Sequence, residues 1–426
     1  MLQSIQTHYI KPIRSFNRAA RLFLLMTIID GVILSGWQLF FNFYILQSGF
    51  NRDFLGLVNS MPSLAGLILG IPLGRISDHI GRKTALIIGL FLTSTFMFAE
   101  ITFRQPPIII AAAFMNGTFN MLFIISQAPL MVKISDEENR TMLFSLNYGL
   151  QTISGAVGSI FAGQLPAVFG GILHVGAASA SAYQAVLIAS VLLGTAALIP
   201  LFMMAEPRPS RATEARPTAI RSGPPHNPPL PNLRVLTLKM TASQILIGFG
   251  AAILIPYMNV FFKFRFNISD SWLGVLFSLS SLMIGIGTFI GPHLATRLGG
   301  KVQAVVATQF SSLIFLLVMG FSPLFWLSAI GYLMRTALMN MASPLYNAFC
   351  MERTPEHQQG FVNSVLNLSW NIGWAVGPFI SGLVQQNYGF TPLFIATAVL
   401  YFAAIVVQWN FFVREERNAP APVTTD

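Results

Sequence analysis

Residues 74–83 read Gly-Arg-Ile-Ser-Asp-His-Ile-Gly-Arg-Lys and join two long apolar segments of the chain. A connection this short makes the flanking segments run antiparallel, and glycine permits a sharp backbone turn where a side chain would collide. We expect Asp78 to lie in the turn, where its carboxylate can meet the N-terminus of the next helix or a nearby arginine. The stretch therefore predicts two antiparallel apolar helices joined by a charged turn.

The composition of the whole chain indicates the class of protein. Hydrophobic residues make up 54% of the 426 residues and charged residues only 9%, which is far too apolar for an ordinary soluble protein. The formal net charge is +10, but the cations lie in short loops, where positive charge orients membrane helices. A single cysteine, Cys350, excludes an intramolecular disulfide and a cysteine-clustered metal site. The sequence predicts an integral membrane protein that binds no nucleic acid.

Twelve apolar spans alternate with short polar connections. They lie at about 22–46, 54–74, 84–103, 107–132, 142–163, 183–205, 235–262, 271–292, 302–322, 324–350, 359–384 and 391–413. Prolines and arginines concentrate between the sixth and seventh spans, which predicts a solvated linker there. The expected organisation is a cytoplasmic segment at 1–21, a six-helix bundle at 22–205, a linker at 206–234, a second bundle at 235–413 and a cytoplasmic tail at 414–426.

The distribution of lysine and arginine predicts the orientation of the spans. With both termini inside, the inner segments hold 20 of these cations and the outer loops hold 4, while Arg335 lies inside a span. This asymmetry is what the positive-inside rule requires. We expect a plasma membrane protein, of the bacterial inner-membrane type, with both termini in the cytoplasm.

The two halves of the chain repeat each other. A shift of 218 residues places Leu55-Gly56 on Leu273-Gly274, and a shift of 219 residues places 156–158 on the identical Ala-Val-Gly at 375–377. Nearly constant offsets indicate a duplicated six-helix unit with a binding site near the bilayer midplane, between the halves. Thr296 stands in the second half where Asp78 stands in the first, so we expect any charge-based latch in the first half alone.

Residues 74–83 resemble the loop between helices 2 and 3 of the major facilitator superfamily, whose pattern is Gly-x-Leu-Ser/Ala-Asp-Arg/Lys-x-Gly-Arg-Arg/Lys. The sequence departs from it at His79, where the family usually has a cation. The resemblance implies an all-α membrane protein with twelve transmembrane helices in two pseudo-repeated bundles, helices 1, 4, 7 and 10 surrounding a central cavity. On this basis we expect transport by alternating access, with a conformational latch formed by Gly74, Asp78, Gly81, Arg82 and Lys83.

Charged residues inside the spans are candidates for coupling. Asp30 lies eight residues into the first span, about 12 Å deep at 1.5 Å per residue, so we interpret it as the proton carrier. The alternative is a fixed, hydrogen-bonded structural acid. Arg335 also lies near the midplane, where it can pair with Asp30, bind an anionic substrate group or brace neighbouring helices. Glu100, four residues before Arg104, predicts an interfacial ion pair.

Polar side chains recur at helical spacing in four spans: Gly31, Ser35, Gln38 and Asn42; Asn116, Asn120 and Gln127; Asn147, Gln151 and Ser154; Asn363, Asn367 and Asn371. In lipid, such a stripe must face an aqueous cavity or a hydrogen-bonded seam between helices. The candidate cavity residues are Gln38, Asn42, Asn116, Asn120, Gln244, Tyr257, Arg335, Tyr346, Trp370 and Trp374. Aromatic rings mixed with amides suit a small, partly apolar organic ligand, although packing alone explains the two tryptophans equally well.

Several classes of function find no support in the sequence. There is no Gly-x-x-x-x-Gly-Lys-Ser/Thr loop, no embedded nucleophile with its base and no histidine pair within a span. We therefore expect no enzyme activity, no cofactor and no metal. The prediction is a monomeric secondary active transporter, in contact with membrane lipid, that exports a small organic molecule in exchange for protons. The alternatives are a proton-independent facilitator or importer of a sugar or organic anion, and a non-transporting receptor or lipid-handling protein.

Overall fold

Helices account for nearly all of the computed structural model, which describes residues 16–205 and 233–413. The first half contains α3 (Arg18–Gln47), α4 (Arg52–Ile80), α5 (Arg82–Thr102), α6 (Pro106–Lys133), α7 (Glu137–Ile172), α8 (Ala180–Ala196) and α9 (Leu198–Met203). The second half contains α10 (Leu233–Ala252), η2 (Ile255–Tyr257), α11 (Met258–Phe266), α12 (Asp270–Arg297), α13 (Lys301–Phe321), α14 (Phe325–Glu352), α15 (Glu356–Tyr388), α16 (Thr391–Gln408) and η3 (Trp409–Val413). The predicted linker and cytoplasmic tail, and most of the predicted N-terminal segment, lie outside the described residues.

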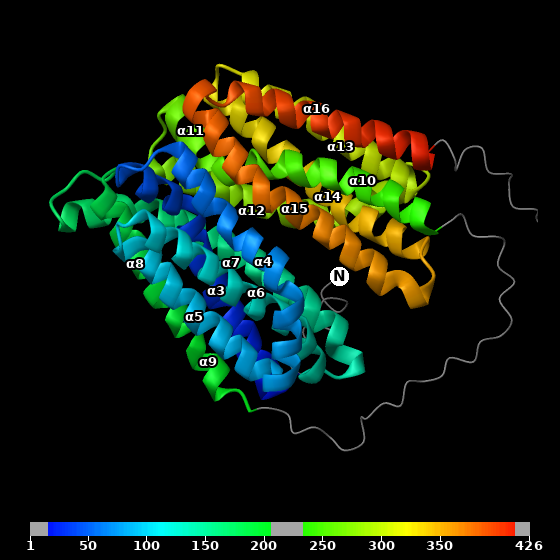
Figure 1. Ribbon diagram of the computed structural model, residues 1–426, viewed down its shortest axis with the longest axis horizontal. Helices are drawn as coiled ribbons and strands as arrows, with labels where there is room; N and C mark the ends of the chain where they lie inside the picture. Colours follow the sequence, from blue (N-terminus) through cyan, green and yellow to red (C-terminus); the bar gives the residue numbers. More distant parts are fainter. Residues whose placement is uncertain (1–15, 206–232, 414–426) are drawn as a thin grey trace, which may run out of the picture.

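The helices form two bundles, which confirms the predicted fold class. In Figure 1, α3–α9 and α10–α16 form adjacent groups that contact each other through α4 with α15 and through α7 with α12. The end of α9 and the start of α10 lie far apart in this view, whereas the opposite ends of the bundles, near α11, lie together. We call the joined end, where α4 and α12 begin and α7 and α15 end, the outer end, following the charge distribution. The other end is the inner end.

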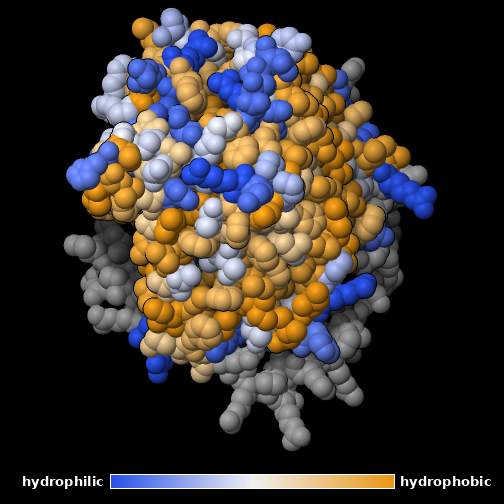
Figure 2. Space-filling model, turned by 60° about the vertical axis from the view of Figure 1, so that its left-hand side comes forward, coloured by the Kyte–Doolittle hydropathy of each residue, from blue (hydrophilic) through white to orange (hydrophobic). Residues whose placement is uncertain are grey.

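The surface matches a lipid environment. Among the described residues, ten helices are long and apolar enough to cross a membrane. Figure 2 shows a face dominated by hydrophobic side chains, and residues such as Ile71, Phe161 and Leu238 are more than 60% exposed. The long helices α14 and α15 fall outside those ten because they carry many polar residues, Arg335 among them. In lipid, polar side chains on these two helices must face water or bond other groups of the protein.

The predicted span at 235–262 is not one continuous helix. The structure breaks it after Ala252, continues through the short 3₁₀ turn η2 and resumes as α11. Pro256 lacks the amide hydrogen that a continuous helix needs, so it favours the break. Carbonyl groups freed there are bonded by other helices, since Asn42 Nδ2 donates to Pro256 O (2.7 Å) and Ser381 Oγ donates to Ile253 O (2.5 Å). The break thus places a bonded, non-helical backbone segment against both bundles.

The connection at residues 74–83 is shorter than expected. Helix α4 extends to Ile80 and α5 begins at Arg82, so a single residue, Gly81, lies between them. Its φ of 90° lies in the region that favours glycine. The prediction that Asp78 lies in a turn is therefore wrong, because the residue lies in the last turn of α4. Helical spacing places its carboxylate next to Arg82, with which it forms an ion pair.

Candidate functional site

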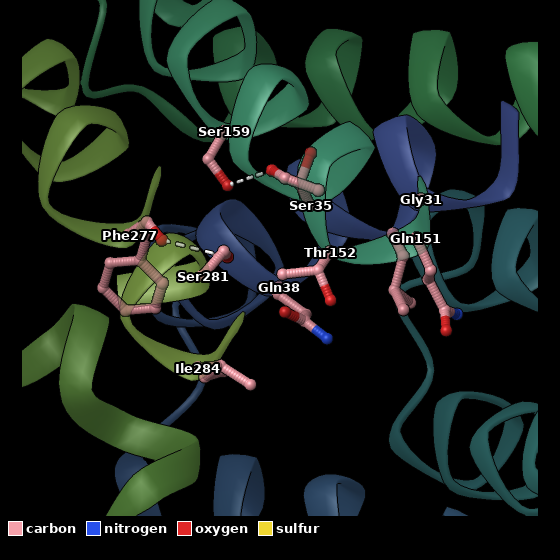
Figure 3. A pocket seen from close by; sticks show the side chains of 11 residues that line it. Gly31, Ser35, Gln38, Gln151, Thr152, Ser159, Phe277, Ser281 and Ile284 are labelled. Atoms are coloured by element: carbon pink, nitrogen blue, oxygen red, sulfur yellow. Dashed lines mark hydrogen bonds between the residues drawn. The ribbon is translucent and has the colours of Figure 1, made fainter. Parts of the chain in front are cut away.

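A cavity of about 140 Å³ lies between the two bundles. Helices α3 and α7 of the first bundle and α12 of the second supply its lining: Gly31, Leu34, Ser35, Gln38, Gln151, Thr152, Gly155, Ser159, Phe277, Ser281 and Ile284. Figure 3 shows the amides of Gln38 and Gln151 and the hydroxyl of Thr152 projecting toward the same open space. These groups both donate and accept hydrogen bonds, so the cavity can hold a polar organic molecule without a fixed charge.

Asp30 lies beside this cavity on α3. The next residue, Gly31, and the residue one turn later, Leu34, both line the cavity, and Asp30 itself is half-buried. Within the described part of the chain, no hydrogen bond or ion pair to its carboxylate is found, including any with Arg335. Asp30 is thus a half-buried acid at membrane depth, next to residues that line the cavity.

Glycines allow the bundles to meet closely at the outer end. A Cβ atom on Gly274 would lie 2.4 Å from Ser159 O and 2.9 Å from Gly163 Cα across the α7–α12 contact. On the other side, a Cβ atom on Gly382 would lie 2.3 Å from Arg52 O, across the α4–α15 contact. Only residues without a side chain permit backbones this close. The outer end is therefore closed by direct helix contact.

Polar side chains add to the outer closure. Asn42 of α3, a predicted cavity residue, donates to Asn259 Oδ1 of α11 (2.9 Å), and Asn259 donates back to Leu39 O (2.9 Å). Asp270 of α12 accepts a hydrogen bond from Tyr183 of α8 (3.2 Å) and forms an ion pair with Lys263. The structure thus places Asn42 in the seam between the bundles at the outer end.

A second cavity, of about 190 Å³, lies within the second bundle. Its lining includes four predicted site residues, Gln244, Arg335, Tyr346 and Trp370. Arg335 Nη2 donates to Tyr401 OH (2.7 Å), and the guanidinium carbon lies 5.7 Å from the centroid of the Tyr401 ring. Three roles were considered for Arg335. In this conformation it does not pair with Asp30, which is one of them.

Other predicted residues lie away from both cavities. Asn116 donates to Glu100 Oε1 (2.8 Å) between α5 and α6, and Glu100 is only 2% exposed. The predicted ion pair of Glu100 with Arg104 is therefore wrong, because burial turns the carboxylate toward the amide of Asn116.

Three further candidates lie outside the two cavities. Tyr257 is fully buried and donates to Pro378 O (2.8 Å), which ties η2 to α15. Asn120 is half-buried in α6, and the Trp374 ring lies 6.4 Å from that of Trp370. None of the three lines either cavity.

Sequence reasoning missed several cavity residues. Gln309 of α13 and Tyr401 of α16 line the second cavity, although the family fold places the corresponding helices away from the centre. Gln309 carries an amide within a strongly apolar span. The sequence alone could have indicated this residue, because a buried amide in a membrane needs a hydrogen-bond partner. Ser281 of α12 gave no such signal, since a hydroxyl can bond the preceding turn of its own helix, as Ser281 does to Phe277 O (3.1 Å).

The predicted latch residues gather at the inner end of α4. Arg82 pairs with Asp78 and also donates to Ser77 Oγ (2.8 Å), which in turn bonds Ser126 of α6 (2.6 Å). The repeat-related connection also has an ion pair, between Lys301 and Glu352 of α14. In the second half, α14 thus supplies the acid that the connection itself lacks, and the expectation of a charge-based latch in the first half alone stays a prediction.

We expect Asp78→Asn to slow transport by up to about fivefold while the protein remains folded, because an exposed ion pair contributes at most about 1 kcal/mol. Initial transport rates in proteoliposomes, with Glu352→Gln as the matched variant of the second half, measure this effect. An unchanged rate for Asp78→Asn would exclude the residue from the latch.

Comparison with known proteins agrees with this architecture. The family model of the Major Facilitator Superfamily matches residues 23–378 and 240–426. The chain belongs to this superfamily. Across 390 residues it is 23% identical to the MFS-type transporter YhhS of Escherichia coli, with 87% of each chain covered. It is also 27% identical to the multidrug resistance protein MdtG of Yersinia enterocolitica over 179 residues, 40% of this chain and 42% of MdtG.

Solved structures of other superfamily members share the fold. The nucleoside transporter NupG superimposes with a TM-score of 0.71 at 13% identity, covering 93% of this chain and 99% of NupG. A bacterial homologue of the iron transporter ferroportin, in an inward-facing state, gives a TM-score of 0.71 at 14% identity, covering 92% and 98%. At this identity the likeness concerns the fold, so the substrate must be argued from the cavities.

Proposed function

We propose that this superfamily member is a secondary active transporter that exports a small organic molecule in exchange for protons across the bacterial inner membrane. Alternating access moves the molecule, and Asp30 carries the proton. The observation that carries the proposal is the carboxylate of Asp30, which has no hydrogen-bond or ion-pair partner among the described residues and lies beside a cavity lined by both bundles.

The closed outer end supports alternating access. Glycine contacts and the bonds of Asn42 and Asp270 hold the bundles together there, while the inner ends diverge in Figure 1. On the second bundle, Asn363 and Asn367 of α15 are exposed near the inner end. Exposure of these amides to lipid would be costly, whereas water in a vestibule open to the inside would solvate them. Together these features fit a state open to the inside.

Two considerations support export of an organic molecule. The partial relative MdtG is named a multidrug resistance protein. The inter-bundle cavity also mixes the amides of Gln38 and Gln151 with the apolar side chains of Leu34, Phe277 and Ile284, which suits an amphipathic ligand.

Proton release from the purified protein in weakly buffered detergent solution tests the proposal. A mixed library of amphipathic compounds is added, and we expect at least one compound to bind and displace protons. Binding of compounds with no change in proton uptake or release would contradict proton exchange and favour a facilitator.

A facilitator or importer of an organic anion is the second candidate, and Arg335 supports it. A buried cation on the cavity wall favours a negatively charged ligand. Transport that is independent of the pH gradient and requires Arg335 would establish this second candidate.

A further inference from the structure

Among the residues that the structure describes, Arg335 is a buried cation without a neutralising acid. Its side chain is 4% exposed, and its described polar partner is the neutral hydroxyl of Tyr401. The acids of the second bundle whose side chains are described, Asp270 and Glu352, are paired with Lys263 and Lys301. A buried guanidinium without a counter-charge carries a large desolvation cost. An anion that enters the cavity would offset that cost.

The guanidinium has donor capacity left for such an anion. Its Nε atom is buried and has no hydrogen-bond partner in the described part of the chain. Nε lies beside an Nη group in the planar guanidinium, which is the arrangement that binds a carboxylate through two parallel hydrogen bonds. Gln309, 5% exposed and on the same cavity wall, has an amide NH2 group that can donate a hydrogen bond to a carboxylate. Unsatisfied groups at this depth are costly unless a ligand or water completes them.

The cavity has a buried end and a more accessible end. Arg335, Gln309, Tyr346 and Tyr401 are all buried, whereas Ser343 is exposed and Gln244 and Asn340 are half-buried. An anionic group would therefore reach Arg335 by passing between α10 and α14, past these three polar side chains. Both helices belong to the set that the superfamily fold places around the central pathway.

The lining also restricts the chemistry of the ligand. One cation neutralises one negative charge, which favours a carboxylate over a phosphate monoester that carries close to two charges at neutral pH. Ile247, Ala251, Ile255, Met339 and Trp370 supply apolar walls, and the volume of about 190 Å³ admits a small ring or short chain.

We infer that the Arg335 cavity is a binding subsite for the carboxylate of a small hydrophobic monocarboxylic acid. The inference rests on the proposed function, since it states the substrate class of the same transporter: an organic acid whose carboxylate binds Arg335 and whose apolar part packs on Trp370 and its neighbours.

Calorimetric titration of the full-length protein in detergent with benzoate tests the inference, and benzamide is the neutral molecule of nearly the same shape. We expect benzoate to bind the wild type and benzamide to bind at least about tenfold more weakly. Arg335→Gln should weaken benzoate binding about 10- to 100-fold, because a hydrogen bond to a charged group is lost. Arg335→Lys should recover part of the affinity, since lysine retains the positive charge but lacks the two parallel donors of the guanidinium.

Arg265→Gln is the matched control, because this exposed arginine at the end of α11 lies outside the cavity. Equal affinities for benzoate and benzamide in the wild type would overturn the inference without any variant. So would benzoate binding that Arg335→Gln and Arg265→Gln leave equally intact. If Arg335→Gln fails to fold, Gln309→Leu should still weaken benzoate binding severalfold, and unchanged binding there would count against the subsite.

The same titration separates this inference from the proposed function. Asp30→Asn should abolish the proton release that accompanies benzoate binding while benzoate still binds, because the carboxylate lies on α3 of the other bundle and does not line the Arg335 cavity. Binding of benzoate without proton release would retain the subsite and reject proton exchange. Proton release by neutral compounds, with no binding of benzoate, would retain proton exchange and reject the subsite.

Discussion

Asp30→Asn is expected to abolish proton-driven accumulation and leave only downhill flux. Asparagine keeps the shape and hydrogen-bonding capacity of the side chain but cannot gain or lose a proton at neutral pH. One proton exchanged per substrate across a difference of about one pH unit sustains roughly a tenfold concentration ratio. In proteoliposomes with an acidic interior we therefore expect the wild type to approach that ratio, and Asp30→Asn to reach a ratio of about one.

Glu100→Gln provides the matched control for Asp30→Asn. Glu100 is also a buried carboxylate in a helix of the first bundle, but it bonds Asn116 between α5 and α6 and lines neither cavity. A glutamine there can still accept the hydrogen bond from Asn116, so accumulation should persist. Normal accumulation by Asp30→Asn would reduce Asp30 to a structural residue. Equal loss in both variants would mean that any acid-to-amide change in this bundle impairs the protein.

Gly274→Ala and Gly382→Ala are expected to open the outer end. In each variant the new Cβ atom would meet backbone atoms at 2.9 Å or less, and backbone cannot rotate away as a side chain can. Overpacking of this kind costs about 1–3 kcal/mol, which shifts the equilibrium between inner-open and outer-open states about 5- to 150-fold. Spin labels at the exposed residues Gln105 and Leu324, near the outer end, should report a longer distance, and transport should fall accordingly.

Gly149→Ala controls for the change in helix propensity, because a Cβ atom at this helical glycine of α7 meets nothing within 4 Å. We expect it to leave both the label distance and transport unchanged. If Gly274→Ala also left the label distance unchanged, the α7–α12 contact would not determine closure, and the hydrogen bonds of Asn42 and Asp270 would have to account for it.

The sequence by itself determined the class and the architecture of this protein. Apolar spans of membrane length, the offset of about 218 residues between the halves and the pattern at residues 74–83 all follow from local composition and spacing. These features persist in any packing arrangement, because a helix in lipid must bond its own backbone and face its apolar residues outward. For the same reason the sequence could point to Asp30 and Arg335, since charges at membrane depth are costly wherever they pack.

Only the tertiary structure decided which polar residues share a space. Asn42 and Gln38 belong to one helical stripe, yet Asn42 bonds Asn259 at the outer closure while Gln38 lines the inter-bundle cavity. Asn116 turned out to bond Glu100, and the hydroxyl beside Arg335 came from Tyr401 on α16, 66 residues away in the chain. Helical periodicity gives the face on which a residue lies, but the partner of that face depends on how helices distant in sequence pack against it.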